Sequence, residues 1–415
     1  MKLLLVQDHL RSGGAARAAA RWADLLRKSG HEVTQAAGDE EGSGAVLVSG
    51  KAPRGLGRLR ELIFGKRSCR IARVRNAFRS LLQCDSWDLV WFHNLAGGEK
   101  WGWSTEMIGT ARQHAPVLWT MHDMWALGDG GEAYWQEDLL AEGGKWKGAE
   151  QSGPKVKRWE GEQGEKVEGL RGLGVEGMRR SRVEKVYREP GKYPVRVTAP
   201  SKWLAELAKE TTGKECMVLP NPIDLKVFSP GDRKAARRRF GLPEEGWVVL
   251  AGADSWQDRR KGFDLLREAW NRRPAGATLA LFGKEGEKRT GTHVLGNLDA
   301  DEDLVAAYRA ADLYVHPARQ ENAPCTIQES LACGTPVLAF AVGGIPEMIQ
   351  PGTTGFLAPQ VTGSALCEAL AGTLSPDGRL ARMREACRNY AEDFWKPETL
   401  VRAWEEVLRK RSPAG

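Results

Sequence analysis

Residues 316–359 read HPARQENAPCTIQESLACGTPVLAFAVGGIPEMIQPGTTGFLAP, and this stretch decides how the chain folds. Its glycines, prolines and apolar residues predict four consecutive elements. They are a loop at 321–325, a helix at 326–332 that stops at Gly334 before Pro336, a short apolar strand at 336–340, and a tight turn at Gly343-Gly344. A strand that leads through a loop to a helix N-terminus leaves N–H groups exposed at 326–328. These groups and the helix dipole favour a phosphate in front of them.

Two carboxylates, Glu321 and Glu329, lie eight residues apart around that loop. We expect Glu329 on the first turn of the helix, where a carboxylate can accept two hydrogen bonds from a vicinal diol such as a ribose. Glu321 lies before the helix and faces whatever is attached to the phosphate. The alternative is that both are solvated surface charges, with Glu329 favoured there by the helix dipole.

The whole stretch resembles the signature of the retaining family 4 glycosyltransferases, which have the GT-B fold. The matching parts occur in order, and they are Glu321, Glu329, Gly334–Val337, Gly343–Glu347 and Gly352–Leu357. The resemblance extends over nearly the whole chain. It implies that Glu321 and the backbone of 322–327, with Asn322, Ala323, Pro324, Cys325 and Thr326, contact the donor, and that Glu329 binds its ribose.

Composition limits the other classes of protein. The 415 residues are enough for two domains of ordinary size, and 41% hydrophobic and 28% charged residues fit a soluble globular protein. Seven scattered cysteines without a C-x-x-C pair indicate a reducing compartment and neither a disulfide framework nor a structural zinc site. We expect no membrane span and no signal peptide. The net charge of +7 comes without the motifs of a nucleic-acid module, so we expect no nucleic-acid partner.

The first half opens with an apolar run at 2–6 that is typical of a central parallel strand. Gly13 and Gly14 follow, just before an alanine-rich helical pattern at 15–28. They indicate a ligand-facing loop at a helix N-terminus or a plain structural turn. The pattern is not G-x-G-x-x-G, which disfavours a nicotinamide or flavin site. The resemblance implies that this loop faces the diphosphate or the acceptor.

Residues 51–80 carry ten Lys or Arg against one acid, with apolar residues such as Leu62, Val74 and Phe78 between them. Such a basic amphipathic segment suits an anionic membrane surface, and relatives often approach lipid-linked acceptors with this part of the chain. The alternative is a pair of ordinary helices with a basic outer face.

Two further apolar strands, at 87–93 and 117–122, end in polar residues. Ligands of open α/β sheets bind beyond the carboxyl ends of strands, which makes His93 and His122 acceptor-side candidates, although a lone histidine is more often structural. Residues 122–125 resemble the His-Asp-x-Trp variant of the family. That variant implies that His122 contacts the transferred sugar. Asp123 then orients the imidazole, and Trp125 either stacks on a sugar or belongs to the core.

The division of the chain follows from a stiff connector at 220–224, PNPID, which resembles the family hinge with Pro222 in place of Gly. We predict an acceptor-side domain at 1–222, a nucleotide-sugar domain at 223–393, and a closing segment at 394–415 that crosses back. Residues 141–192 match the family poorly. They hold 22 charged residues and 11 glycines, and we expect an insertion without a core of its own.

In the second half, Lys261 before Gly262 matches the family lysine that contacts the donor diphosphate. The usual upstream arginine is absent, and we expect Arg260 to replace it. A solvated basic turn is the alternative. The resemblance also implies base contacts after the following strands, near Gly283 and His293.

The predicted fold is therefore α/β, with two Rossmann-like domains facing across a cleft. The predicted function is transfer of a sugar from a nucleotide sugar, most simply a UDP- or GDP-sugar, to a glycan or lipid-linked acceptor, with retention. Lys261 and an arginine neutralise the leaving diphosphate, so we expect no metal and no cofactor. The expected location is cytoplasmic, on the inner face of a membrane. Alternatives are a nucleotide-sugar epimerase of the same fold and a catalytically silent binding or scaffold protein.

Overall fold

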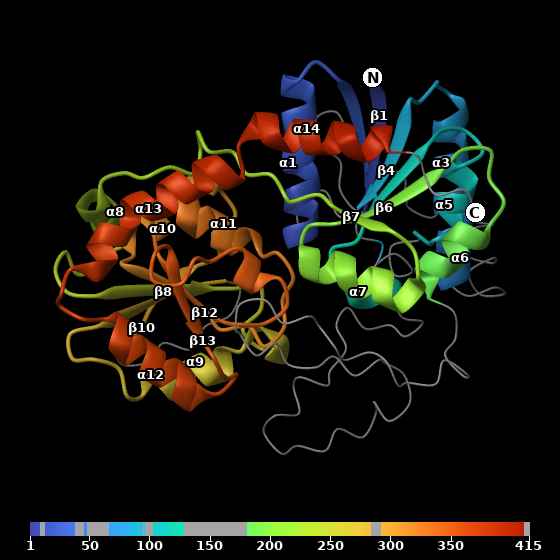
Figure 1. Cartoon of the computed structure of the whole chain (residues 1–415). Helices are drawn as coiled ribbons and strands as arrows, with labels where there is room; N and C mark the ends of the chain where they lie inside the picture. The colour runs from blue at the N-terminus through green and yellow to red at the C-terminus, as the bar shows by residue number, and fades with distance from the viewer. Residues whose placement is uncertain are drawn as a thin grey trace.

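The computed structural model describes residues 1–8, 13–37, 45–47, 66–93, 95, 103–127, 181–283 and 292–410. In these residues the chain forms two parallel sheets, each flanked by helices, that lie side by side as two lobes (Figure 1). The predicted architecture of two α/β units is confirmed. Most of the insertion expected at 141–192 and the basic residues 51–65 lie outside the described residues.

The first sheet has seven described strands in the order β3-β2-β1-β4-β5-β6-β7, all parallel. Their bounds are β1 Lys2–Gln7, β2 Glu32–Ala37, β3 Ala45–Leu47, β4 Leu89–His93, β5 Val117–Thr120, β6 Val195–Ala199 and β7 Cys216–Val218. The helices around it are α1 Gly14–Lys28, α3 Lys66–Gln83, α5 Glu106–Ala111, α6 Arg182–Arg188 and α7 Lys202–Thr212. The strand order reverses between β1 and β4, where a ligand crevice forms in sheets of this type.

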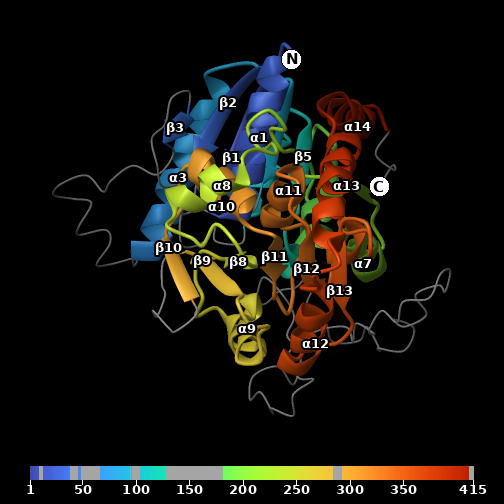
Figure 2. The same cartoon turned by 90° about the vertical axis from the view of Figure 1, so that its left-hand side faces the viewer.

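The second sheet has six described strands in the order β10-β9-β8-β11-β12-β13, which Figure 2 shows edge to edge. The bounds are β8 Val248–Gly252, β9 Thr278–Phe282, β10 Thr292–Gly296, β11 Leu313–His316, β12 Val337–Phe340 and β13 Gly355–Ala358. Its helices are α8 Arg233–Arg239, α9 Phe263–Trp270, α10 Asp301–Ala310, α11 Cys325–Ala332, α12 Gly363–Thr373 and α13 Arg379–Phe394. The order reverses between β8 and β11.

The last helix, α14 Pro397–Arg409, leaves the second lobe and packs beside α1 on the first (Figure 1). Trp404 is fully buried there, with its ring centroid 5.2 Å from that of His31 and 6.3 Å from that of Trp91. Arg196 of β6 donates two hydrogen bonds to the carbonyl oxygen of Lys410. The buried apolar cluster of the second lobe therefore continues through α14 to one face of the first sheet.

Helix α3 uses its apolar residues inside the protein. Val74 and Phe78 are fully buried, and Phe78 contacts the rings of Phe92 and Trp103 edge to face. These two residues are therefore core residues and do not form an exposed apolar stripe. None of the described helices combines the length and the apolar character needed to cross a bilayer.

Several predicted bounds were wrong by one or two residues. Helix α11 begins at Cys325, so Glu329 is its fifth residue and lies on the second turn instead of the first. Strand β5 ends at Thr120, so His122 and Asp123 follow the strand in the turn before a 3-10 helix at Met124–Leu127.

Candidate functional site

The candidate site forms where the strand order of the second sheet reverses. The turn after β8 carries Arg260 and Lys261 on a short 3-10 helix, and the loop after β11 carries Glu321. The two segments touch because residue 262 is a glycine at φ 69°. A Cβ there would lie 1.8 Å from the carbonyl oxygen of Pro317, so any other residue would force the segments apart.

Glu321 receives two cations. Lys261 Nζ lies 2.7 Å and Arg260 Nη1 lies 3.0 Å from its Oε2, and the residue is 9% exposed. Burial alone would raise the pKa of this carboxyl, but Lys261 and Arg260 outweigh it and hold the pKa well below its usual range. Glu321 is therefore ionised at neutral pH. Asp258 also pairs with Arg260, at 3.3 Å, so two cations and two carboxylates meet here.

His316 belongs to the same cluster, although it was not among the predicted site residues. Its Nε2 lies 3.9 Å from Glu321 Oε2, and its Nδ1 lies 3.4 Å from the hydroxyl of Tyr314. Burial lowers the pKa of His316 to about 4, so the ring is neutral at pH 7. Its position as the last residue of β11 was the available signal, because that end of the strand faces the predicted site.

Glu329, on the second turn of α11, is buried and contacts the other lobe. It is 1% exposed, and Arg21 of α1 donates to its Oε1 at 2.6 Å. Tyr308 of α10 donates to Oε2 at 3.0 Å, and Arg17 lies 3.5 Å from Oε1. The alternative of a solvated surface glutamate is therefore wrong. Arg17 and Arg21 were missed, although they stand four apart after the Gly-Gly turn, which places them on one face of a helix.

The N-terminus of α11 faces the Gly-Gly turn across the cleft. Gly13 adopts φ 89° as the N-cap of α1, and Cys325 Sγ donates to the carbonyl oxygen of Gly14 at 3.6 Å. Pro324 is the N-cap of α11, and Thr326 Oγ1 lies 3.5 Å from His316 Nδ1. The N–H of Ile327 already donates to the carbonyl oxygen of Pro324 at 3.1 Å. The N–H groups of Cys325 and Thr326 are then the ones that a helix start offers to an anion.

Asn322 and Ala323 hold the two lobes together with their polar atoms. Asn322 accepts from Ser201 Oγ at 2.5 Å and donates to the carbonyl oxygen of His122 at 3.0 Å. The carbonyl oxygen of Ala323 accepts from the side chain of Asn221 at 3.2 Å. The side chain of Asn322 is therefore engaged with the first lobe, and only backbone groups of this pair remain for a donor.

The acceptor-side residues meet, but in roles that differ from the predicted ones. His93 Nδ1 and His122 Nε2 lie 3.0 Å apart, and burial lowers the pKa of His122 to about 4. Asp123 accepts from the backbone N–H of Trp125 at 3.0 Å, so the partner of the His122 ring is His93 and the predicted orienting role of Asp123 is not observed. Burial raises the pKa of Asp123 to about 6.

Trp125 is a core residue. It is 7% exposed, and the guanidinium of Arg182 lies 4.0 Å from its ring centroid while donating to its carbonyl oxygen. That cation covers the face that a sugar would need, which favours the core alternative over stacking on a sugar.

Gly283 lies just after the end of a strand, whereas His293 lies within one. Gly283 follows β9, and its N–H donates to the carbonyl oxygen of Gly296 at 2.9 Å, which places both at the carboxyl ends of their strands. His293 pairs in register with Ala280 in the middle of the strand, and its ring faces Gly241 after α8. The structure therefore does not bring His293 to the Lys261 cluster.

Residues 299–303, DADED, have the spacing of a metal motif. In the structure each aspartate has another partner: Asp299 accepts from Asn297, Asp301 pairs with Arg17 at 3.2 Å, and Asp303 pairs with Arg239. Within the described residues no three His, Cys, Asp or Glu side chains converge on a metal position.

Two family models match this chain. The model of Glycosyltransferase Family 4 matches residues 12–227, which is more than half of the chain, and the model of Glycosyl transferases group 1 matches residues 248–394. The chain belongs to glycosyltransferase family 4.

Curated relatives of this family member are D-inositol 3-phosphate glycosyltransferases. That of Catenulispora acidiphila is 32% identical over 203 residues, covering 43% of this chain and 48% of the relative. That of Mycobacteroides abscessus is 36% identical over 153 residues, covering 33% and 34%. The chain thus spans about half or less of the length of these relatives.

Solved structures match over almost the whole length of this family 4 chain. Sucrose-phosphate synthase from Thermosynechococcus elongatus has a TM-score of 0.70 at 19% identity, covering 98% of both chains. Anabaena HepE in complex with UDP and glucose has a TM-score of 0.67 at 17% identity, covering 98% and 99%. At these identities the likeness establishes the fold.

The Arg21–Glu329 pair gives a prediction about stability. Arg21→Met leaves a buried carboxylate without its main cation, so we expect the free energy of unfolding to fall by about 3–5 kcal/mol in urea denaturation. Arg17→Met removes a more exposed and more distant cation from the same carboxylate, so about 1 kcal/mol or less is expected. Equal losses in the two variants would contradict the proposed difference.

His316 gives a prediction about pH. Its folded pKa of about 4 lies below its ordinary value of 6.5, so the unfolded chain takes up a proton that the folded chain does not as pH falls from about 6.5 to about 4. This contribution to stability is complete above pH 6.5 and is lost over that window. Between pH 7 and 5, His316→Gln should lose about 2 kcal/mol less stability than the parent protein in urea titrations. Identical losses would show that this ring does not titrate as inferred.

Proposed function

We propose that this protein transfers a glycosyl unit from a nucleotide sugar to an acceptor hydroxyl with retention of anomeric configuration. The observation that carries the proposal is the cluster of Lys261, Arg260 and Glu321 at the carboxyl ends of β8 and β11, beside the N-terminus of α11. Cations and helix N–H groups that converge at such a point suit a diphosphate. The names of the curated relatives and the UDP-glucose complex of Anabaena HepE support a nucleotide-sugar donor.

The charge state of Glu321 limits the mechanism. A carboxylate whose pKa is held far below neutrality cannot donate a proton to a leaving group. Its pairing with Lys261 and Arg260 also weakens it as a nucleophile. We therefore assign no covalent protein intermediate. The acceptor hydroxyl attacks on the face that the diphosphate leaves, and the diphosphate takes up the proton of that hydroxyl. Lys261 and Arg260 stabilise the negative charge that develops on the diphosphate.

The other predicted contacts have different support. We propose that the backbone at 322–326, with Gly13 and Gly14 opposite it, surrounds the diphosphate. We propose that Glu329 binds the ribose hydroxyls. Arg21 and Tyr308 donate to different oxygens of its carboxylate, and each oxygen can accept a second hydrogen bond. His122 faces the cleft from the acceptor side, with its ring fixed by His93.

The acceptor is proposed to be a glycan or a lipid-linked sugar, reached from the first lobe, and the proposed location is the cytoplasmic face of a membrane. Because Val74 and Phe78 are buried, these two residues of α3 offer no apolar contact to such a surface. We place the boundary between the two functional halves at the 220–224 connector, where Asn221 binds both Ala323 and Gln328.

Substitution of the cluster tests the site. Lys261→Ala should lower kcat/KM for donor turnover by about 10²–10³-fold, because one preorganised charge is removed from the leaving group. Lys226→Ala, an exposed lysine of the same half, is the matched control and should retain full turnover. Full activity of Lys261→Ala would rule out the cluster as the donor site.

Glu329→Gln should raise KM for the donor, and this conservative change is preferred because the carboxylate also holds Arg21.

A donor panel tests the function itself. UDP-, GDP-, ADP- and dTDP-sugars are compared by thermal shift and by slow hydrolysis followed as released nucleoside diphosphate. We expect one base to stabilise the protein and to be hydrolysed. Binding without hydrolysis or transfer would favour the scaffold alternative, and an epimerised sugar nucleotide would favour the epimerase.

A further inference from the structure

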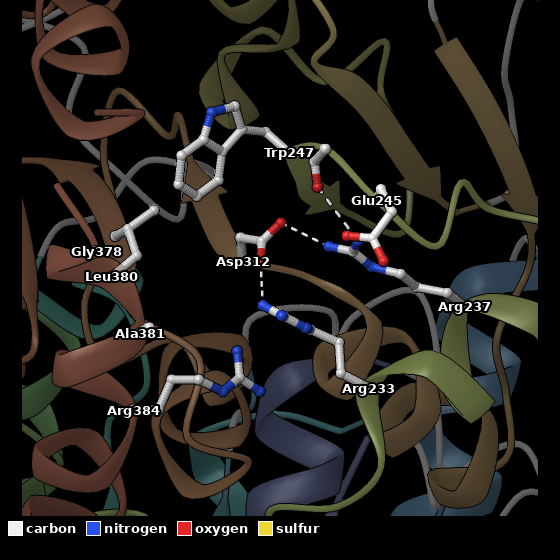
Figure 3. Close-up of a pocket in the computed structure, with 10 residues that line it drawn as sticks. Arg233, Arg237, Glu245, Trp247, Asp312, Gly378, Leu380, Ala381 and Arg384 are labelled. Atoms are coloured by element: carbon white, nitrogen blue, oxygen red, sulfur yellow. Dashed lines mark hydrogen bonds and ion pairs between the residues drawn. The ribbon is translucent and has the colours of Figure 1, made fainter. Parts of the chain in front are cut away.

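A cavity of about 270 Å³ lies at the opposite edge of the second sheet, where β8 and β11 begin (Figure 3). Trp247 and Asp312 immediately precede those two strands, whereas the Lys261 cluster follows them. Strands of four or five residues separate the two edges by roughly 13–17 Å. The cavity is therefore distinct from the donor site.

Asp312 lines this cavity, and both of its carboxylate oxygens already accept hydrogen bonds. It is 4% exposed, and it accepts from Arg237 Nη2 at 2.6 Å, from Arg233 Nη1 at 2.5 Å and from the N–H of Val248 at 2.8 Å. Arg237 is itself 1% exposed and also donates to the carbonyl oxygens of 244, 246 and 310. Asp312 and Arg237 therefore form a structural ion pair, and neither side chain is left to bind a ligand.

The lining of the cavity holds more cations than acids. Arg384 of α13 donates to the carbonyl oxygen of Ala311 at 3.0 Å, and burial together with the charge of Arg233 lowers the pKa of Arg384. Arg233 is 42% exposed and shares Asp312 with Arg237. The other acid in the lining, Glu245, is exposed and pairs with Lys234. Arg233 and Arg384 thus line the same cavity, and its buried carboxylate, Asp312, is already bound by Arg233 and Arg237.

The cavity wall suits a ligand larger than a single ion. The indole of Trp247 lies on one side of Asp312 and the guanidinium groups of Arg233 and Arg384 lie on the other (Figure 3). Leu380, in the first turn of α13, adds an apolar wall, and the positive end of that helix favours negative charge in the same place.

We propose that this cavity binds a small phosphate-bearing anion through Arg384 and Arg233. A guanidinium pair matches a phosphate in charge and geometry, and a phosphate between the two removes their mutual repulsion. The site does not depend on the proposed sugar transfer. Because Arg384 lies on α13, which leads directly into α14, a ligand here binds the element that joins the second lobe to the first.

Isothermal titration tests the site with inorganic phosphate and with glucose 6-phosphate, at ionic strength held constant with chloride. The titrated proteins are the parent chain, Lys261→Ala, Arg384→Gln and, as a matched loss of one exposed arginine from the same C-terminal helices, Arg402→Gln. Lys261→Ala is included because phosphate also suits the donor cluster. If Arg384→Gln does not fold, Arg233→Gln takes its place, since that side chain is partly exposed.

We expect saturable binding that survives Lys261→Ala and Arg402→Gln and weakens about tenfold or more in Arg384→Gln, as loss of a charge-assisted hydrogen bond requires. The ratio of the two affinities then distinguishes free phosphate from a phosphorylated sugar as the source. Binding that disappears in Lys261→Ala and persists in Arg384→Gln belongs to the donor cluster and would overturn the proposal. The absence of saturable binding in the parent chain would overturn it as well.

Discussion

The ion pair between Arg21 and Glu329 joins the two halves of this molecule through two buried side chains. A carboxylate that is 1% exposed carries a large desolvation cost, and it is tolerated only because a guanidinium and a phenol from two different helices bind both of its oxygens. The guanidinium comes from the first lobe and the phenol from the second. The position of Glu329 therefore depends on how the lobes are docked, and the docking depends on Glu329.

Other contacts at this interface are built in the same way. Asn322 binds Ser201 and the backbone of His122, while Glu347 accepts from the backbone N–H groups of Lys202 and Trp203 at the start of α7. In each case a polar group of the second lobe satisfies a helix terminus or loop of the first. Polar contacts of this kind are direction-dependent, so they fix one relative orientation, whereas apolar contact through α14 supplies affinity with less geometric demand.

Glu321 and Glu329 are identical side chains with different roles, because their surroundings differ. Glu321 lies on the loop after β11 and binds two cations, which keeps it ionised. Glu329 follows eight residues later, on α11, where it is buried. Its cation, Arg21, comes from the other lobe. The spacing of eight residues places one before the helix and the other on its second turn, so they serve different neighbours.

The sequence was sufficient to predict the two sheets, the order of their elements, and the meeting of Lys261, Arg260 and Glu321. These features follow from local patterns: apolar runs, glycine and proline punctuation, and strand ends that converge at one edge of a parallel sheet. The prediction failed where a side chain had a choice of partner across space. Asp123 binds the turn that follows it instead of His122. For Trp125, which the sequence left open between the core and a sugar contact, the guanidinium of Arg182 favours the core.

By itself, then, the sequence determined which segments form the cluster of Lys261, Arg260 and Glu321, because backbone conformation at Gly262 and the start of α11 are local properties. Only the tertiary structure decided that Arg21 binds Glu329, that His93 holds His122, and that Arg384 approaches Arg233. These pairs join residues far apart in the chain, and their energies depend on burial, which no short window of sequence specifies.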